Sequence, residues 1–448
     1  MKRILIFVFV ILFSGCAVKS INEDFSDILL DENLSKEYQL KSNWWEDYNQ
    51  PYLNELVELG LKNSINLAKA AISINKALAQ VGLIKSELMP KFNANLGIET
   101  SRDISKNDTF KESYNSGFSL SYEIDLFKKL SDSKDAAIWE LQATKFDLEA
   151  AKLTLINSII DRYFEILYLK ESLKFYEISL QNYVQLEAII RAKFELGKTD
   201  ELSLKQVQSS ILNVKNRILN LNRNLNLAEQ TLRNLLSVKP EFEFKINEIL
   251  LSDINFLGIN LDVPLYAISN RPDLKAAISR IEESLLNVKV SEKSFYPSLT
   301  LGASISSRGD RAKDAFKFQF LGGNLAINLP FLNYSRLKNS LKISEYNFEN
   351  MKLNYEEKLV AALNEVDLGY KNWQKDREIF ANYEKQMQNL RYIRDMYKIK
   401  FDLGKTELKN FLEAKNNEID MQNSLLLQRY KILQDEINVF KAMAGKIK

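Results

Sequence analysis

A single cysteine, Cys16, is the residue of this 448-residue chain whose chemistry is easiest to assign. It follows two basic residues, Lys2 and Arg3, and the apolar run Ile4–Phe13. An apolar run of this length is too short to cross a bilayer as a helix, so residues 1–15 are predicted to be a signal peptide for export.

The residues before the cysteine, Leu12-Phe13-Ser14-Gly15, have the pattern of a bacterial lipid-attachment site. We therefore expect Cys16 to become the lipidated first residue of the mature chain. Ala17 follows it rather than aspartate, which favours sorting to the outer membrane. The alternative is an ordinary signal peptide that is cleaved nearby, with an incidental cysteine.

The composition excludes many kinds of enzyme. The chain has no histidine, and lipid would consume its cysteine, so Ser-His-Asp triads, cysteine nucleophiles and most transition-metal sites are ruled out. The 61 basic and 59 acidic residues nearly balance, which gives no indication of nucleic-acid binding, and the sequence contains no P-loop. We expect no enzymatic activity, no cofactor and no metal, although a purely carboxylate-based enzyme is left open.

An internal repeat is the strongest pattern in the sequence. Residues 194–199 (FELGKT) recur as residues 401–406 (FDLGKT), an offset of 207. The same offset relates Pro90 to Pro297, Leu67 to Leu274, and Tyr163 to Tyr370. Several landmarks in one register indicate a tandem duplication.

The duplication predicts how the chain is organised. Five segments are expected: a signal peptide at 1–15, a lipidated N-terminal segment at 16–57, a first repeat at 58–240, a linker at 241–264, and a second repeat at 265–448.

The spacing of prolines and glycines predicts very long helices. No proline lies between residues 91 and 239 or after residue 330, and a proline inside a helix costs about 3 kcal/mol. Helix-forming residues with apolar side chains three or four apart fill both stretches. The predicted helices span about 59–89, 128–195, 200–236, 265–295, 333–402 and 407–444.

Four segments of alternating apolar and polar residues lie between these helices. They begin near Phe92, Phe118, Leu299 and Phe316, and each has about ten residues, the length that a tilted membrane strand needs. In the fourth segment the apolar parity changes at Gly322-Gly323, which predicts a β-bulge there.

Four membrane strands cannot close a barrel by themselves, because the smallest membrane barrels have about eight. An open sheet edge in lipid would leave backbone groups without partners. If the strands are membrane strands, several chains must share one barrel, and a water-filled lumen favours three or more. A soluble four-stranded sheet with one wet face is the alternative.

Several motifs of this chain resemble the outer-membrane efflux protein family, the TolC-like outer-membrane factors. The resemblance covers nearly the whole mature chain. Its motifs are Asn270-Arg271-Pro272-Asp273-Leu274, Tyr296-Pro297-Ser298-Leu299, Tyr122-Glu123-Ile124-Asp125-Leu126-Phe127, and Trp44-Trp45 with Pro51. The resemblance implies a mainly α-helical protein with a membrane β-barrel, in which a homotrimer forms a twelve-stranded barrel and a long α-helical barrel.

The resemblance also implies a function. Such a trimer is the exit duct of a tripartite pump, held in the outer membrane with most of the chain in the periplasm. Its expected partners are outer-membrane lipid, a periplasmic adaptor protein and an inner-membrane transporter of the resistance–nodulation–division class. Small molecules such as drugs or toxic compounds are the expected cargo, and a type I protein secretion system is the alternative use of the same duct.

The two copies of the repeated motif are expected to be helical hairpin tips. Glycine suits a left-handed turn, threonine suits a helix N-cap, and acidic residues suit a helix start. The resemblance adds contact with the adaptor protein. The predicted contact residues are Leu196, Gly197, Lys198, Thr199, Leu403, Gly404, Lys405 and Thr406.

Acidic residues near the second tip of such proteins ring a closed aperture. The matching positions here are Asn410 and Glu413, and Asn410 departs from the family's acid. Glu413, together with Glu407, is therefore the expected ring. Two proteins of other classes are left as alternatives: a secreted structural coiled-coil protein and a lipid-anchored periplasmic enzyme.

Overall fold

The computed structural model describes residues 40–41, 43–102, 104–106, 109–246, 249–259 and 268–447. The predicted signal peptide, Cys16 and the end of the predicted linker lie outside these residues. The chain divides into two compact units, which are described separately. One comprises Ser73–Thr144 and Ala276–Tyr355, and the other contains the described parts of Glu32–Ile72, Lys145–Lys275 and Glu356–Lys448.

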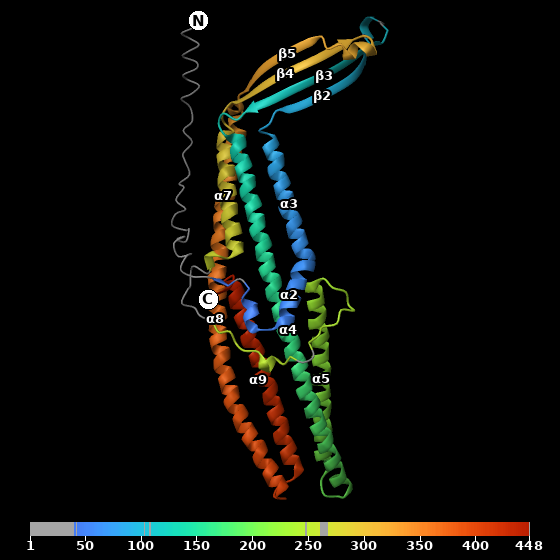
Figure 1. Ribbon diagram of the computed structural model, residues 1–448, viewed down its shortest axis with the longest axis vertical. Helices are drawn as coiled ribbons and strands as arrows, with labels where there is room; N and C mark the ends of the chain where they lie inside the picture. The colour runs from blue at the N-terminus through green and yellow to red at the C-terminus, as the bar shows by residue number, and fades with distance from the viewer. Residues whose placement is uncertain are drawn as a thin grey trace. The chain divides into compact units, whose positions relative to one another are not determined.

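Long α-helices dominate the chain, as the distribution of proline and glycine predicts. The two longest, α4 and α8, have 67 and 69 residues. At 1.5 Å per residue each is about 100 Å long. The α-helices of the described residues are α2 (Pro51–Asn63), α3 (Ile65–Ser86), α4 (Lys129–Glu195), α5 (Glu201–Leu236), α7 (Pro272–Lys293), α8 (Tyr334–Asp402) and α9 (Leu408–Ala442), labelled in Figure 1.

The first predicted helix, about 59–89, is instead two helices. Ser64 separates α2 from α3 because its backbone is extended, with ψ of 116°. Its Oγ accepts a hydrogen bond from the backbone N–H of Leu67 at 3.3 Å, which satisfies a donor in the first turn of α3. The apolar periodicity continues across this break, so the break leaves no signal in the pattern.

The helix predicted at 265–295 has its described bounds at Pro272 and Lys293. Proline at the first helical position needs no hydrogen-bond partner for its nitrogen, so Pro272 favours a helix start there.

One four-stranded antiparallel sheet forms in the first unit, with strand order β2-β3-β4-β5. The strands are β2 (Lys91–Ser101), β3 (Lys111–Ile124), β4 (Ser298–Gly309) and β5 (Phe320–Asn328). Figure 1 shows them side by side, with the β2–β3 and β4–β5 loops at the same end. The central β3–β4 pair joins the two repeats through contacts such as Phe118 opposite Ile305.

The predicted β-bulge at Gly322-Gly323 is wrong. Gly322 pairs with Ser304 and Gly323 pairs with Ala303 in an unbroken register. The parity change has another cause: Phe316 ends the 3₁₀ helix η5 (Ala312–Phe316), and β5 begins only at Phe320.

In the second unit the N-terminal segment packs into the helical core. Trp44 and Tyr48 lie in the 3₁₀ helix η2 (Trp44–Tyr48) and are almost fully buried. The Trp44 ring lies 5.1 Å from Phe440, and the Tyr48 ring lies 5.0 Å from Phe164. Near the chain ends, β1 (Leu40–Lys41) pairs antiparallel with β6 (Lys446–Ile447).

Part of the predicted linker packs onto the same unit. Leu251 begins the 3₁₀ helix η4 (Leu251–Asp253) and is fully buried, as is nearly all of Ile254. Arg429 of α9 donates from Nε to the carbonyl of Leu251 at 3.0 Å.

Candidate functional site

One face of the four-stranded sheet is mainly apolar. Pairing places alternate residues of all four strands on it, for example Ala94 beside Phe118 and Phe118 beside Ile305. Many of its side chains are exposed: Phe92 is 82% and Leu321 is 85% accessible. Large exposed apolar patches are rare on soluble monomers and mark contacts with membranes or partners.

The opposite face is mainly polar, and small residues occupy the middle of β3 and β4 on it. Three asparagine–glycine pairs lie directly across it: Asn95 opposite Gly117, Asn115 opposite Gly97, and Asn324 opposite Gly302. A Cβ at Gly302 would lie 2.1 Å from Oδ1 of Asn324. The asparagine amides therefore fold over the glycines and lie flat against the sheet.

Both copies of the repeated motif form the same tight turn, as predicted. Gly197 and Gly404 have φ of +66° and +68°, the left-handed region that favours glycine. In the first turn the N–H of Lys198 donates to Lys193 at 2.8 Å, and in the second the N–H of Lys405 donates to Lys400 at 2.7 Å. These bonds are those of a Schellman motif, so each turn is rigid.

The threonines of these turns are not the helix caps, contrary to prediction. Asp200 is the N-cap of α5, and its Oδ1 accepts from the N–H of Ser203 at 3.0 Å. That hydrogen bond lowers the pKa of the Asp200 carboxyl. Glu407 holds the N-cap position of α9, where Asn410 donates to Thr406 Oγ1 at 2.8 Å. For α5, Asp200 is a better cap than Thr199, because its carboxylate places a negative charge at the positive end of the helix.

The tip side chains are mostly exposed. Leu196 is 69% and Leu403 is 62% accessible, and both lysines of the turns are exposed. The tips thus present two apolar side chains on rigid turns.

The candidate aperture acids differ in their contacts. Glu407 Oε2 lies 2.7 Å from Nζ of Lys193 on α4, and this hydrogen bond lowers the pKa of Glu407. Glu413 faces Lys409 on its own helix at 3.9 Å and is exposed. Asn410 is half-buried. Sequence reasoning grouped these residues, whereas the structure commits Glu407 to a contact between the hairpins.

Polar contacts join α4 to α9 above the tips. Asn416 of α9 is buried and accepts from Ser179 Oγ at 3.2 Å and from Asn182 Nδ2 at 3.1 Å. Closer to the tips, residues of α4, α5 and α9 form an apolar cluster. Its buried members are Leu186, Ile190, Leu204, Val207 and Leu412.

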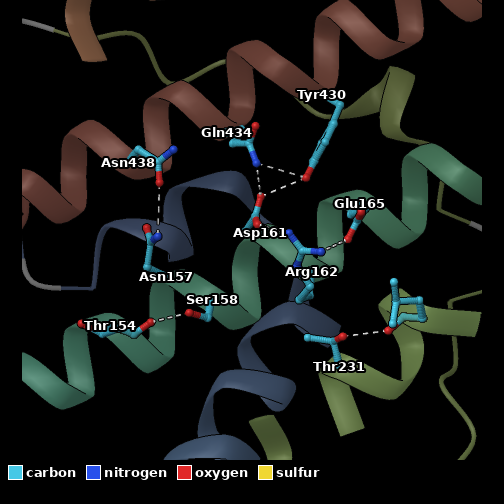
Figure 2. A network of polar contacts seen from close by, with 11 residues as sticks. Thr154, Asn157, Ser158, Asp161, Arg162, Glu165, Thr231, Tyr430, Gln434 and Asn438 are labelled. Carbon is cyan, nitrogen blue, oxygen red and sulfur yellow. Dashed lines mark hydrogen bonds and ion pairs between the residues drawn. The ribbon is translucent and has the colours of Figure 1, made fainter. Parts of the chain in front are cut away.

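A second polar cluster lies farther along these two helices. Figure 2 shows Asp161 of α4 directed at Tyr430 and Gln434 of α9, which donate to its Oδ1, each at 3.0 Å. Burial raises the pKa of the Tyr430 hydroxyl, so the phenol remains a donor at neutral pH. Arg162 lies beside Asp161 at 2.5 Å and balances its charge.

Sequence reasoning missed Glu436 of α9, which is fully buried. Its carboxylate accepts from the N–H of Gly258 at 2.8 Å, the N–H of Leu257 at 3.0 Å, Tyr48 OH at 3.2 Å and Trp373 Nε1 at 3.4 Å. A signal existed, since the residues three and four positions away on α9 are all apolar. An acid on a buried stripe needs such partners.

Nothing in the described part of the chain forms a metal site, because no group of three histidine, cysteine or acidic side chains comes together there. One described helix, α3, is long and apolar enough to cross a membrane by length and composition, and only 6% of its apolar window is buried. Ile65, Ile72 and Leu83 contribute to this exposed apolar surface.

An amphipathic sheet with open edges, very long helices and two rigid tips are features of a channel subunit. The family model "Outer membrane efflux protein" matches residues 56–238 and 263–445, and both limits of the second match lie 207 residues after those of the first. The chain belongs to the outer membrane efflux protein family.

Related proteins and structures agree. The chain is 36% identical to toxin and drug export protein A of Aggregatibacter actinomycetemcomitans, over 92% of this chain and 91% of that protein. It is 24% identical to the pyoverdine export outer membrane protein OpmQ of Pseudomonas putida, over 90% and 87%.

The fold matches solved outer-membrane channels. OprN has a TM-score of 0.81 at 19% identity, covering 93% of this chain and 96% of that one. The CmeC channel of Campylobacter jejuni has a TM-score of 0.80 at 22% identity, covering 97% and 94%. The predicted family, fold class, outer-membrane location and efflux-channel function are confirmed, and the coiled-coil alternative is set aside.

Proposed function

We propose that a homotrimer of this chain is the exit duct of a tripartite pump, with a twelve-stranded barrel in the outer membrane. The observation that carries the proposal is the sheet order β2-β3-β4-β5, in which β2 and β5 are the edges. In lipid both edges need partners, and pairing β5 of one subunit with β2 of the next supplies them. The apolar face then meets lipid and the polar face lines the lumen.

The exposed apolar surface of α3 supports the same assembly. Ile65, Ile72, Leu78 and Leu83 are each more than half exposed in the single chain. Contact with a neighbouring subunit would bury this surface, and each Å² of apolar surface removed from water stabilises the assembly by about 25 cal/mol.

The hairpin tips are proposed to dock onto a periplasmic adaptor protein that connects the duct to an inner-membrane transporter of the resistance–nodulation–division class. Residues 196–199 and 403–406 would form the contact. Rigid turns that carry exposed Leu196 and Leu403 support this role, because preorganised apolar side chains lose little entropy on binding.

The aperture is proposed to lie beside the second tip, with Glu413 as its acid. Three copies of Glu413 around one axis would repel each other and attract cations. Lys409, 3.9 Å away, would partly screen each carboxylate. Glu407 and Asn410 are proposed as its neighbours in the ring, with Glu407 held aside by Lys193.

The division of the chain is proposed as 1–15 signal peptide, 16–57 lipidated segment, 58–240 first repeat, 241–264 linker and 265–448 second repeat. Cys16 is proposed to carry the lipid. Labelling with a radioactive fatty acid tests this assignment: label must enter the wild-type protein and be absent from Cys16→Ser, and label retained in Cys16→Ser would contradict it.

The cargo is proposed to be small molecules such as drugs or toxic compounds, and the chain is proposed to have no catalytic activity. The relative at 36% identity is named for toxin and drug export, which supports this cargo. That name also favours a second candidate, a type I protein secretion system.

Electron microscopy of the detergent-extracted protein tests the duct. A three-fold particle with a barrel is expected, and a monomer would contradict the proposal.

Docking is tested with Leu196→Asp/Leu403→Asp in cells: drug resistance is expected to fall while trimers stay intact. Leu196→Met/Leu403→Met, which keeps the apolar contact, is the matched control. Drug efflux and protein secretion use different inner-membrane transporters. Deleting the gene for each candidate transporter and measuring drug resistance and protein secretion therefore shows which function the duct serves.

A further inference from the structure

Charged side chains on the polar face of the sheet lie near the strand ends. On β3 no charged residue occupies this face between Asn115 and Ser121, and on β4 none does between Ser298 and Ser306. Serine, threonine, asparagine and glycine fill these positions. The middle of the wall is therefore hydrophilic and uncharged.

Near the loop end, Arg308 of β4 reaches across β3 to Glu99 of β2. Its Nη2 lies 3.2 Å from Oε2 of Glu99, and its Nε donates to Ser113 Oγ of β3 at 2.9 Å. Asn115 donates from Nδ2 to Oε1 of Glu99 at 3.3 Å. Gly97 stands opposite Asn115, and a Cβ there would lie 2.7 Å from the Asn115 amide oxygen. The pair is thus held by a network that spans three strands.

The duplication does not explain this pair. At the offset of 207, the counterpart of Glu99 is Ser306 and that of Arg308 is Ser101. Each repeat contributes one charge, and the pair forms only because β3 and β4 join the repeats. Both side chains are more than 60% exposed, so neither is needed to fill a core.

The charges at the helix end of this face also have partners of opposite sign. Glu123 lies 3.4 Å from Nζ of Lys129, and Lys91 pairs with Glu87. Lys111, the first residue of β3, is the other charge on this face at the loop end. Lys111 is the same in every variant compared below, so replacing Glu99 or Arg308 changes the balance of charge at this end by one charge per subunit.

We propose that Glu99 and Arg308 are the specificity-determining pair at the outer end of the duct, and that their mutual neutralisation lets cargo of either charge leave. The inference rests on the proposed function, because this face lines a lumen only in the trimeric barrel. Three pairs alternate in sign around the mouth, so their fields cancel. Removing one partner leaves three like charges, whose field repels ions of that sign.

Purified trimers in planar lipid bilayers provide the test, with reversal potentials measured in a KCl gradient. Arg308→Gln is expected to shift the K⁺/Cl⁻ permeability ratio toward K⁺, and Glu99→Gln toward Cl⁻, each on the order of twofold. The double variant Glu99→Gln/Arg308→Gln is expected to return to the wild-type ratio. Opposite shifts with restoration distinguish charge balance from a general structural effect.

A second readout is independent of the periplasmic aperture. A trivalent cation added on the barrel side is expected to block current through Arg308→Gln more strongly than current through the wild type, Glu99→Gln or the double variant. Lys313→Gln is the matched control, because Lys313 lies in η5, whose carbonyls accept hydrogen bonds from Ser116 and Ser307 on the apolar face.

These outcomes separate the two proposals. If wild-type protein conducts but Arg308→Gln gains no barrel-side block, or both single variants shift in the same direction, the pair does not set selectivity. If electron microscopy of the wild-type protein shows no barrel shared by three chains, the duct itself is wrong. An effect of Lys313→Gln equal to that of Arg308→Gln would also overturn the assignment.

Discussion

Lys193 of α4 and Glu407, the N-cap of α9, form an ion pair at 2.7 Å between the two helical hairpins. The residues are far apart in sequence and come from different repeats. The pair holds the second tip, where the proposed aperture lies, against the first. Exposed pairs contribute only about 0.2–1 kcal/mol each, so such a contact can break during opening.

Lys193→Gln is therefore expected to raise single-channel conductance or open time in planar bilayers, because the second tip loses its tie to α4. The charge swap Lys193→Glu/Glu407→Lys is expected to restore the wild-type value. Lys205→Gln is the control, since its partner Glu201 lies on the same helix at 3.7 Å. An equal effect in Lys205→Gln would show that the change in conductance does not depend on the ion pair between Lys193 and Glu407.

Glu413→Gln is expected to weaken block by a trivalent cation added on the side of the tips, because the ring loses three carboxylates. Lys409→Gln is expected to strengthen block, since it removes the cation 3.9 Å from each Glu413. Asn410→Asp adds acids beside the ring and is expected to strengthen block as well. Unchanged conductance and cation sensitivity in Glu413→Gln would show that the ring is wrongly assigned.

Glu436→Ala is expected to destabilise the helical unit by about 2 kcal/mol or more, because buried donors from Gly258, Leu257 and Tyr48 lose their acceptor. A thermal melt followed by tryptophan fluorescence measures the change, since Trp373 also contacts Glu436. Glu55→Ala, at an exposed position of α2, is the control. If the melting curve of Glu436→Ala coincides with that of the wild type, this carboxylate does not stabilise the folded protein.

Asp435→Asn is expected to stabilise the protein at pH 8 and to change little at pH 4. Burial, reinforced by the nearby Asp376, raises the pKa of Asp435 to about 7 from 3.8. A raised carboxyl pKa means that its contribution to stability is fully present below about pH 4 and is lost as pH rises through 7. Asparagine stays neutral and avoids this loss.

Melting midpoints between pH 4 and pH 8 check this expectation. The wild-type midpoint should fall more steeply across that range than the midpoint of Asp435→Asn. Asp367→Asn is the control, because Asp367 is exposed and pairs with Lys371 at 2.8 Å. Parallel pH profiles for wild type and Asp435→Asn would show that Asp435 is not a titrating group of the folded state in this range.

The prediction from sequence succeeded for features that depend on neighbouring residues. The absence of proline predicts the 67 residues of α4, and the alternation around Phe118 predicts which residues of β3 share a face. Gly197 and Gly404 predict two left-handed turns. The prediction failed where the local pattern was incomplete: the break at Ser64 has no periodicity signal, and the phenylalanines before β5 imitated a strand with a bulge.

The sequence by itself determined the duplication, the long helices, the rigid tips and the two faces of the sheet, because each follows from the steric and hydrophobic properties of residues close in the chain. Only the tertiary structure decided that Glu436 accepts the N–H of Gly258, that Lys193 pairs with Glu407 and that Arg308 pairs with Glu99. These contacts join residues from distant segments. Their geometry depends on helix packing and strand register, which are set by the whole fold and leave no local trace.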